Sequence, residues 1–327
     1  MSITNISSDP ETLTLTVVGD YSVSVERLWE AWADPRQLEQ FWGPETWPAT
    51  FLRHDMTPGG RSEYFMTGPD SQISRGWWRF LSVDPGRSFE VEDGFADDEG
   101  RPNDQMPTSR INITFESTEE GSRFTMITTF ASREQMKQLL EMGMLEGMKS
   151  AIGQMDDVLA DLKSFAADRL TSATILTDTQ IRVSRVVRGT VEQVWQAYHD
   201  PDLLRQWALG PEGWTMPVCE IASEVGDDYR YEWENADGSA SFGFVGEVLE
   251  FEPPRRLVAT ELMIGMEGPP SVNALTFTPT QAGTLVTLVV TYPSTEARDG
   301  ALDSGMIDGM ESSYARLESK VLDSSST

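Results

Sequence analysis

Histidine, cysteine and carboxylate side chains are the groups in this chain that could carry out acid–base, nucleophilic or metal chemistry. The chain has two histidines, His54 and His199, one cysteine, Cys219, and 53 acidic side chains. His54 stands next to Asp55, and an imidazole beside a carboxylate can form an acid–base pair, although a surface histidine at the end of a strand is the simpler interpretation. Carboxylates are so abundant that a single Asp or Glu with a raised pKa inside a cavity is a further alternative.

The usual catalytic and cofactor motifs are missing from the sequence. Histidine and cysteine do not occur at metal-ligand spacings, no glycine-rich loop opens a helix after a strand, and Gly-x-Ser-x-Gly does not occur. The two histidines also occupy different places in the two halves of the chain, which excludes a shared histidine base. We therefore expect no catalytic residue, no metal and no cofactor, and we favour a protein that is not an enzyme.

The elements that must position any site occur twice. Val25 to Phe41 reappears as Val191 to Trp207, with Val, Glu, Trp, Ala, Asp, Pro, Leu and Gln at matching places. A repeat this long is a whole domain, because solenoid repeats run at about 20–50 residues. The sequence predicts domains at residues 10–164 and 179–323, and a linker at 165–178, where Ala, Ser and Thr occur without a clear period.

Each copy begins with a strand and two short helices. Thr12 to Val17 alternates as a half-buried strand does, Ser24 can cap the first helix, and Asp34-Pro35 ends that helix and starts the next. Thr190, with Gln193 as a capping box, and Asp200-Pro201 repeat these signals in the second copy. A Gly-Pro-Glu turn then closes the helix pair in both copies, and several short strands follow.

Each copy ends with an alternating strand and a long amphipathic helix. We expect the two helices at about Arg133 to Ser164 and at about Glu296 to Val321. Glycine inside a helix costs about 1 kcal/mol relative to alanine, so close approach of another surface would explain the Gly-Met pairs. These pairs are Gly143-Met144, Gly147-Met148, Gly305-Met306 and Gly309-Met310.

The composition favours a cytoplasmic protein that binds neither nucleic acid nor membranes. A formal net charge of −28 repels nucleic acid and anionic lipid. No apolar run approaches the ~20 residues of a membrane span, and Met1 to Ser8 lacks the basic and apolar parts of a signal peptide. The single cysteine fits a reducing compartment. The acidity serves solubility or, as an alternative, attracts a basic protein partner.

The order strand, two helices, six strands, long helix is that of the helix-grip fold. The chain resembles the SRPBCC (START-like) superfamily and, within it, the family named after the activator of the heat-shock protein 90 ATPase. The resemblance rests on Val25-Glu-Arg-Leu-Trp29, Asp34-Pro35, Phe41-Trp42-Gly43-Pro44, Pro58-Gly59-Gly60-Arg61, Pro253-Pro254-Arg255-Arg256-Leu257-Val258 and the Gly-Met pairs. The second copy departs at Trp207-Ala208-Leu209-Gly210, which contains one inserted residue, and at Gly226-Asp227, where the first copy has Gly59-Gly60.

The resemblance implies an α+β fold with two tandem helix-grip domains, each a curved antiparallel sheet wrapped around its C-terminal helix with an apolar cavity between them. The candidates for the cavity walls are Phe124, Met126, Met144, Met148, Val286, Leu288, Met306 and Met310. The same residues equally fit a filled core. Phe124 and Met126 offer more aromatic and polarisable surface than Val286 and Leu288, so we expect stronger binding in the first copy.

Three functions are compatible with this fold. The first is non-enzymatic binding of an apolar small molecule in the cavity. The second is a co-chaperone or other protein-interaction role, with a protein partner. The third is an enzyme of the cyclase or hydrolase type found in the same superfamily, which would need one buried carboxylate.

Overall fold

The computed structural model describes residues 3–161, 170–209 and 213–322. Contacts divide the chain into Met1–Leu162 and Lys163–Thr327, which we call unit 1 and unit 2. Residues 210–212 of the expected Gly-Pro-Glu turn and 165–169 of the expected linker lie outside the described residues. Within the described residues, no helix has the length and apolar character that crossing a membrane would require.

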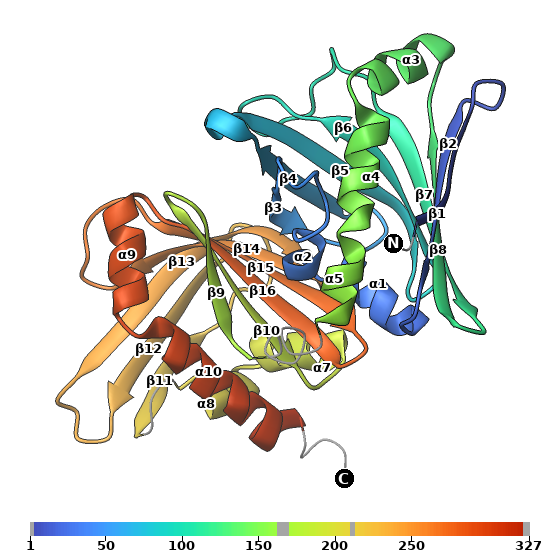
Figure 1. Ribbon diagram of the computed structural model, residues 1–327. Helices are drawn as coiled ribbons and strands as arrows, with labels where there is room; N and C mark the ends of the chain where they lie inside the picture. The colour runs from blue at the N-terminus through green and yellow to red at the C-terminus, as the bar shows by residue number, and fades with distance from the viewer. Residues whose placement is uncertain (1–2, 162–169, 210–212, 323–327) are drawn as a thin grey trace. The chain divides into compact units, whose positions relative to one another are not determined.

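Unit 1 is an α+β domain in which an antiparallel sheet curves around the helices that follow it (Figure 1). Its described residues form eight strands in the order β1-β2-β8-β7-β6-β5-β4-β3. The elements in chain order are β1 (Ile3–Asp9), β2 (Thr14–Tyr21), α1 (Val25–Ala33), α2 (Pro35–Leu38), β3 (Ala49–His54), β4 (Arg61–Thr67), the short turn η1 (Pro69–Ser71), β5 (Ile73–Asp84), β6 (Ser88–Phe95), β7 (Ser109–Thr118), β8 (Gly121–Thr129), α3 (Arg133–Glu141), α4 (Met144–Gly153) and α5 (Met155–Ala160).

Unit 2 repeats this architecture. Its described residues also form an eight-stranded antiparallel sheet, in the order β11-β12-β13-β14-β15-β16-β10-β9. The elements in chain order are β9 (Ser172–Thr177), β10 (Gln180–Val187), α7 (Val191–His199), α8 (Pro201–Trp207), β11 (Trp214–Glu220), β12 (Asp228–Asn235), β13 (Ser241–Glu252), β14 (Arg256–Met263), β15 (Ser271–Thr280), β16 (Gly283–Thr291), α9 (Thr295–Asp303), α10 (Met306–Arg316) and the π-helical turn η2 (Leu317–Leu322).

The helices of each pair begin where the sequence predicts, and the first helix of each pair also ends there, whereas α2 ends at Leu38, before Phe41 and Trp42. The Ser24 side chain accepts a hydrogen bond from the Arg27 amide, and Thr190 and Gln193 form the reciprocal capping box. Asp34 and Asp200 each end one helix and cap the next by accepting from backbone amides of the following turn. These caps satisfy amides that have no partner inside the helix, which is why the boundaries can be predicted from local sequence.

The structure adds one strand at the start of each unit. β1 pairs with β2, and β9 pairs with β10, both antiparallel. β1 is mostly exposed and polar, so it lacks the alternation that predicts a strand. Residues 172–177, which the sequence analysis assigned to the linker, form β9 and belong to the sheet of unit 2. These residues form a strand because they pair with β10, and their own sequence shows no pattern that predicts one.

The closing helix of each unit is broken, which corrects the expectation of one long helix. Gly143 and Gly305 have φ of +88° and +80°, a left-handed conformation that glycine adopts without strain, and each starts a new helix. Close approach of another surface does not explain the other two glycines. An added Cβ at Gly147 would meet only the Pro44 ring at 3.7 Å, and one at Gly309 would meet nothing within 4 Å.

Candidate functional site

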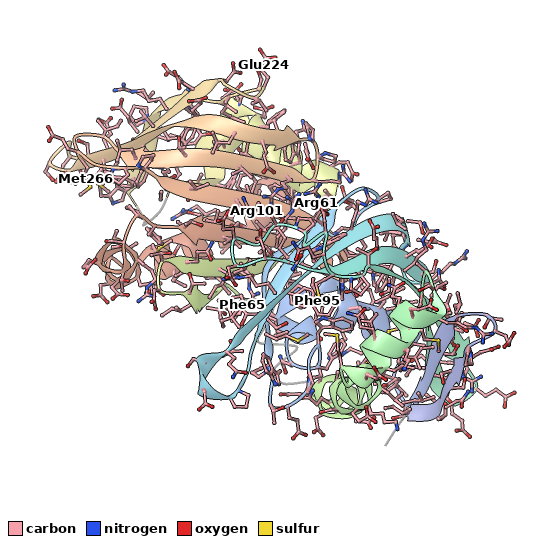
Figure 2. The ribbon with its side chains drawn as sticks, turned by 90° about the horizontal axis from the view of Figure 1, so that it is seen from above. Arg61, Phe65, Phe95, Arg101, Glu224 and Met266 are labelled. Atoms are coloured by element: carbon pink, nitrogen blue, oxygen red, sulfur yellow. The ribbon has the colours of Figure 1, made fainter. Side chains whose placement is uncertain are left out.

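Unit 2 contains a cavity of about 960 Å³ between its sheet and α10. Its walls are mainly apolar and include a group of aromatic side chains, namely Trp207, Trp214, Tyr231, Trp233, Phe242 and Phe244. The rim includes Gly305 and Asp308, both exposed, at the break between α9 and α10. Met263 also lines the cavity, and the β14–β15 turn that follows it carries Met266 at its tip (Figure 2).

The cavity exists because large side chains of unit 1 are small in unit 2. In unit 1 the cross-strand pair Ser62–Trp78 places an indole in the core, whereas Tyr229–Gly246 takes the equivalent place in unit 2. Trp78 is fully buried, whereas a Cβ added at Gly246 would collide with the Thr260 carbonyl and the Tyr229 ring, so no side chain replaces the indole there. An indole removed from a packed core leaves a void unless neighbours collapse into it.

A second set of substitutions enlarges the same space. Phe80 and Phe89, both fully buried in unit 1, correspond to Val248 and Leu257, which line the cavity of unit 2. Phe124, also fully buried, corresponds to Val286, which is part of the neighbouring core. In unit 1 Trp32 packs against Phe89 and Phe124 with ring centroids 5.8 and 6.1 Å apart. The core of unit 1 is therefore filled by aromatic rings at the place where unit 2 is hollow.

The predicted wall residues divide between cavity and core. Leu288, Met306 and Met310 line the cavity of unit 2, whereas Val286 is buried in the apolar cluster around Trp195 and Leu317. In unit 1, Phe124, Met126 and Met148 are members of one continuous core, and Met144 packs against it. The first copy, which we expected to bind more strongly, holds its candidates in that core, and the cavity described here lies in the second.

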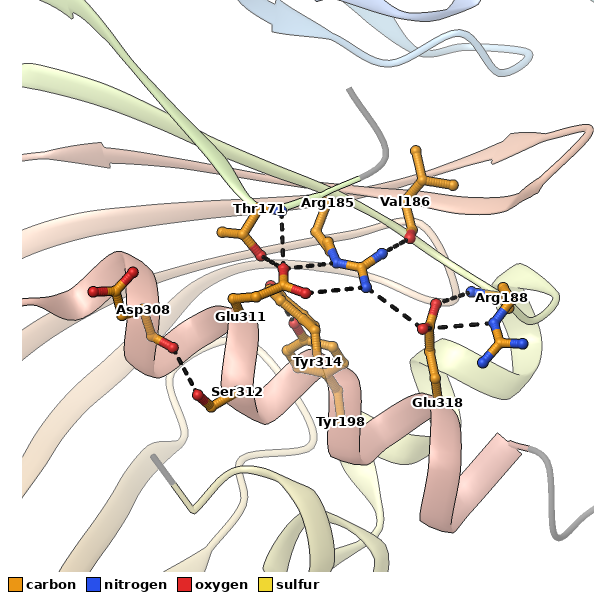
Figure 3. Close-up of polar contacts among 10 residues, drawn as sticks. All are labelled: Thr171, Arg185, Val186, Arg188, Tyr198, Asp308, Glu311, Ser312, Tyr314 and Glu318. Atoms are coloured by element: carbon orange, nitrogen blue, oxygen red, sulfur yellow. Dashed lines mark hydrogen bonds and ion pairs between the residues drawn. The ribbon is translucent and has the colours of Figure 1, made fainter. Parts of the chain in front are cut away.

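Ion pairs and hydrogen bonds tie α10, which lines the cavity, to other elements of unit 2 (Figure 3). Glu311 of α10 accepts from the Arg185 guanidinium at 3.0 Å and from the Thr171 amide at 2.9 Å, and Glu318 lies 3.4 Å from the same guanidinium. The Tyr198 and Tyr314 hydroxyls are 2.9 Å apart and tie α7 to α10. α10 thus presents Met306 and Met310 to the cavity from a fixed position.

A polar cluster of Glu261, Asn273 and Tyr229 interrupts the apolar wall. Asn273 donates to the Glu261 carboxyl, but its own buried Oδ1 has no hydrogen-bond partner. The Tyr229 hydroxyl donates to the Thr260 carbonyl at 2.9 Å and lies 3.5 Å from Glu261 Oε2, which is a weak contact. Burial raises the pKa of Glu261.

Unit 1 has a carboxylate at the equivalent position, but with different partners. Asp93 accepts from the Trp78 indole N–H at 2.9 Å and from the Ser109 hydroxyl at 3.3 Å, and burial raises its pKa to about 6. In unit 2 the indole is replaced by Gly246, and the equivalent Ser271 donates instead to the backbone carbonyl of Glu261. The Glu261 carboxyl therefore lacks both donors and faces the cavity.

The two histidines have different environments. His54 is buried rather than exposed at the surface as expected, because its Nδ1 lies 2.8 Å from Ser62 Oγ and its Nε2 lies 3.0 Å from the Trp32 carbonyl. His199 lines the cavity, stacks on Trp195, and has a lowered pKa because it is buried. Neither His199 nor Glu261 was predicted from the sequence to line a cavity. The sequence feature that could have indicated Glu261 is that the equivalent residue of the first copy, Asp93, is also a carboxylate.

Comparison with known proteins agrees with the repeated architecture. The family described as activator of Hsp90 ATPase homolog 1-like protein matches residues 22–160 and 188–321. A solved protein from Arthrobacter aurescens is 44% identical, with a TM-score of 0.47, and the match covers 49% of this chain and 93% of that chain. A solved protein from Mycobacterium smegmatis is 45% identical, with a TM-score of 0.46 and coverage of 49% and 98%.

A third solved protein, from Rhodobacter sphaeroides, is 29% identical, with a TM-score of 0.44 and coverage of 48% and 99%. None of the curated proteins compared with the chain matches it. The family match covers both units and includes the helix pair, the sheet and the closing helices of each. The chain therefore belongs to the activator of Hsp90 ATPase homolog 1-like family, as a tandem of two domains.

Proposed function

We propose that unit 2 binds a hydrophobic small molecule in its cavity and does not catalyse a reaction on it. The observation that carries this proposal is a volume of about 960 Å³ bounded by aromatic and aliphatic side chains with a few polar groups. Ligand sites in proteins are typically about 300–1,000 Å³ and have walls of this composition. Burial of an apolar ligand here would be favoured by about 25 cal/mol for each Å² removed from water.

Unit 1 has a different role in this proposal. Its predicted wall residues Phe124 and Met126 are fully buried, and Trp32 and Trp78 fill the centre of the same core. A ligand would have to displace these packed rings, which costs several kcal/mol. We place the binding activity in unit 2 and regard unit 1 as a folded partner domain.

Matched tryptophan substitutions in the two units test the proposal. Met310→Trp narrows the cavity of unit 2, and Met148→Trp makes the same change at the equivalent position in the core of unit 1. With a neutral apolar dye such as N-phenylnaphthylamine, we expect the wild type to bind and Met310→Trp to weaken binding about tenfold or more. Its unfolding free energy should change by less than about 1 kcal/mol, because an open space accepts the ring.

Met148→Trp should retain dye binding and lose about 1–3 kcal/mol of stability, because it overpacks a filled core. Dye fluorescence and urea unfolding measure both quantities. If the wild type binds no dye and both variants are equally destabilised, the cavity does not act as a ligand site, and the protein-interaction alternative takes precedence.

A further inference from the structure

The charged side chains among the described residues that line the cavity of unit 2 are of one sign. Among the described residues that line it, Glu261 and Asp308 are carboxylates and none is lysine or arginine. His199 also lines the cavity and could carry a positive charge, but its lowered pKa keeps it neutral at pH 7. A cation entering the cavity therefore meets acceptors and no like charge, whereas an anion meets repulsion.

The Glu261 carboxyl accepts from Asn273 and, weakly, from Tyr229, and the two oxygens of a carboxylate can accept further donors. At the equivalent place in unit 1, Asp93 receives the Trp78 indole N–H and the Ser109 hydroxyl, and both donors are lost to Glu261. The buried Oδ1 of Asn273 is a second acceptor without a partner in the same cluster. Buried acceptors are normally satisfied, so this cluster fits a ligand that supplies the missing donors.

The aromatic walls fit the same kind of ligand. Tyr229 and Tyr231 lie beside Glu261, and their rings are 5.0 Å apart. Faces of tyrosine and tryptophan attract organic cations through the ring quadrupole, and this attraction grows when the cation is removed from water. A carboxylate among aromatic rings therefore selects a positively charged donor that is attached to an apolar body.

We propose that the cavity of unit 2 binds an apolar amine, whose ammonium group donates hydrogen bonds to Glu261 and to Oδ1 of Asn273 while its apolar part fills the aromatic walls. This inference rests on the proposed function, because it assumes that the cavity opens to a small molecule. It adds the chemical class of the ligand and names the residues that recognise its polar end.

Two probes that differ in one group test the inference. Dansylcadaverine carries an aromatic body and an alkyl chain that ends in an ammonium group, and its analogue carries a methyl group in place of the ammonium. We expect the wild-type protein to bind the ammonium probe about tenfold or more tightly than the neutral analogue, because a charge-assisted hydrogen bond in a buried site is a strong one.

Glu261→Gln should remove this preference, so that the variant binds the ammonium probe and the neutral analogue about equally. Asp308→Asn, at the exposed rim, should weaken the preference less than Glu261→Gln does, and Asp303→Asn, exposed and outside the described wall, is the control that should retain it. Loss of the preference in Asp308→Asn but not in Glu261→Gln would overturn the assignment. Equal binding of both probes by the wild type would overturn the amine inference and leave the proposed function intact, whereas binding of neither would overturn both.

A pH series on the wild type provides a second test that needs no variant. The affinity for the ammonium probe should fall as the pH is lowered through the pKa of Glu261, because a proton then competes with the ligand, and the neutral analogue should show no such fall. Tyr229 and Tyr231 from β12 and Tyr292 after β16 also face Glu261, but their pKa values are raised and they stay neutral. Protonation of His199 at acid pH acts in the same direction. A pH-independent preference would contradict the inference.

Discussion

Single side chains decide whether a helix-grip unit of this chain is filled or hollow. The pair Ser62–Trp78 in unit 1 and the pair Tyr229–Gly246 in unit 2 occupy the same rungs of the sheet with large and small residues exchanged. The exchange moves an aromatic ring from one strand to its neighbour and removes the donor that Asp93 uses. One position thus changes both the volume of the core and the electrostatics of the carboxylate beside it.

The raised pKa of Asp93 predicts a pH dependence of stability. The unfolded chain releases this proton near the ordinary pKa of 3.8 and the folded chain only near about 6, so the contribution of Asp93 is fully present at low pH and is lost as the pH rises between these values. The loss is on the order of 3 kcal/mol. Asp93→Asn should remove this fall.

Urea unfolding of the full chain at pH 4 and pH 7 checks the prediction, through the difference between wild type and variant at each pH. Asp98→Asn, at an exposed position, is the control and should follow the wild type. A wild type and an Asp93 variant whose stabilities change in parallel between the two pH values would show that Asp93 ionises in the folded state as it does in the unfolded chain.

At the scale of elements, the break in the closing helix is the feature that both units share. Gly143 and Gly305 adopt positive φ, whereas Gly147 and Gly309 lie within α4 and α10. In unit 2 the break at Gly305 changes the direction of the chain between α9 and α10, and it lies at the rim of the cavity. The two glycine-methionine pairs of each unit thus have different roles: the glycine of the first pair breaks the helix, and the second pair lies within the helix that follows.

Alanine substitutions separate these two roles. Gly305→Ala should lower the unfolding free energy by about 1–2 kcal/mol, because a Cβ is strained in the left-handed conformation. Gly309→Ala should raise it by about 0.4–1 kcal/mol, because the helical position has open space for a methyl group and alanine reduces the entropy of the unfolded chain. Urea unfolding measures both. Equal effects of the two substitutions would show that the helix is continuous in solution.

At the scale of the whole molecule, the two units have separate sheets and separate cores. We expect the fragments 1–162 and 163–327 each to fold cooperatively, because each contains a complete set of elements. Circular dichroism during urea unfolding of each fragment is the measurement. A fragment that remains unfolded by itself would contradict the two-core architecture.

A shorter fragment provides the control for unit 2. Residues 178–327 lack β9 and also Thr171, whose amide and hydroxyl both donate to Glu311 of α10. This fragment should be less stable than 163–327 and should bind the neutral dye more weakly, because α10 loses one of its anchors. Equal stability of the two fragments would show that β9 adds nothing to the sheet of unit 2.

The duplication is visible directly as a repeat in the sequence. The caps at Ser24, Asp34, Thr190 and Asp200 and the alternation of the last strands could be predicted because they depend on residues a few positions apart. The order of these elements also identified the family, which the match over both units confirms. β1 and β9 were missed because edge strands take their structure from a neighbour. The helix breaks were missed because the spacing of the glycines does not show which of them adopts a positive φ.

Only the tertiary structure decided where the space is. Leu288, Met306 and Met310 line a cavity while Phe124, Met126 and Met148 are part of a core, although both sets have the same pattern in the sequence. The core of unit 1 is filled because Trp78, Phe80 and Phe89 occupy it, and these residues lie on strands far from the methionines in sequence. Whether the space beside a methionine is filled therefore depends on side chains from other strands that pack against it. Glu261 and Asn273 meet for the same reason, because β14 and β15 pair in a register that the sequence pattern does not specify.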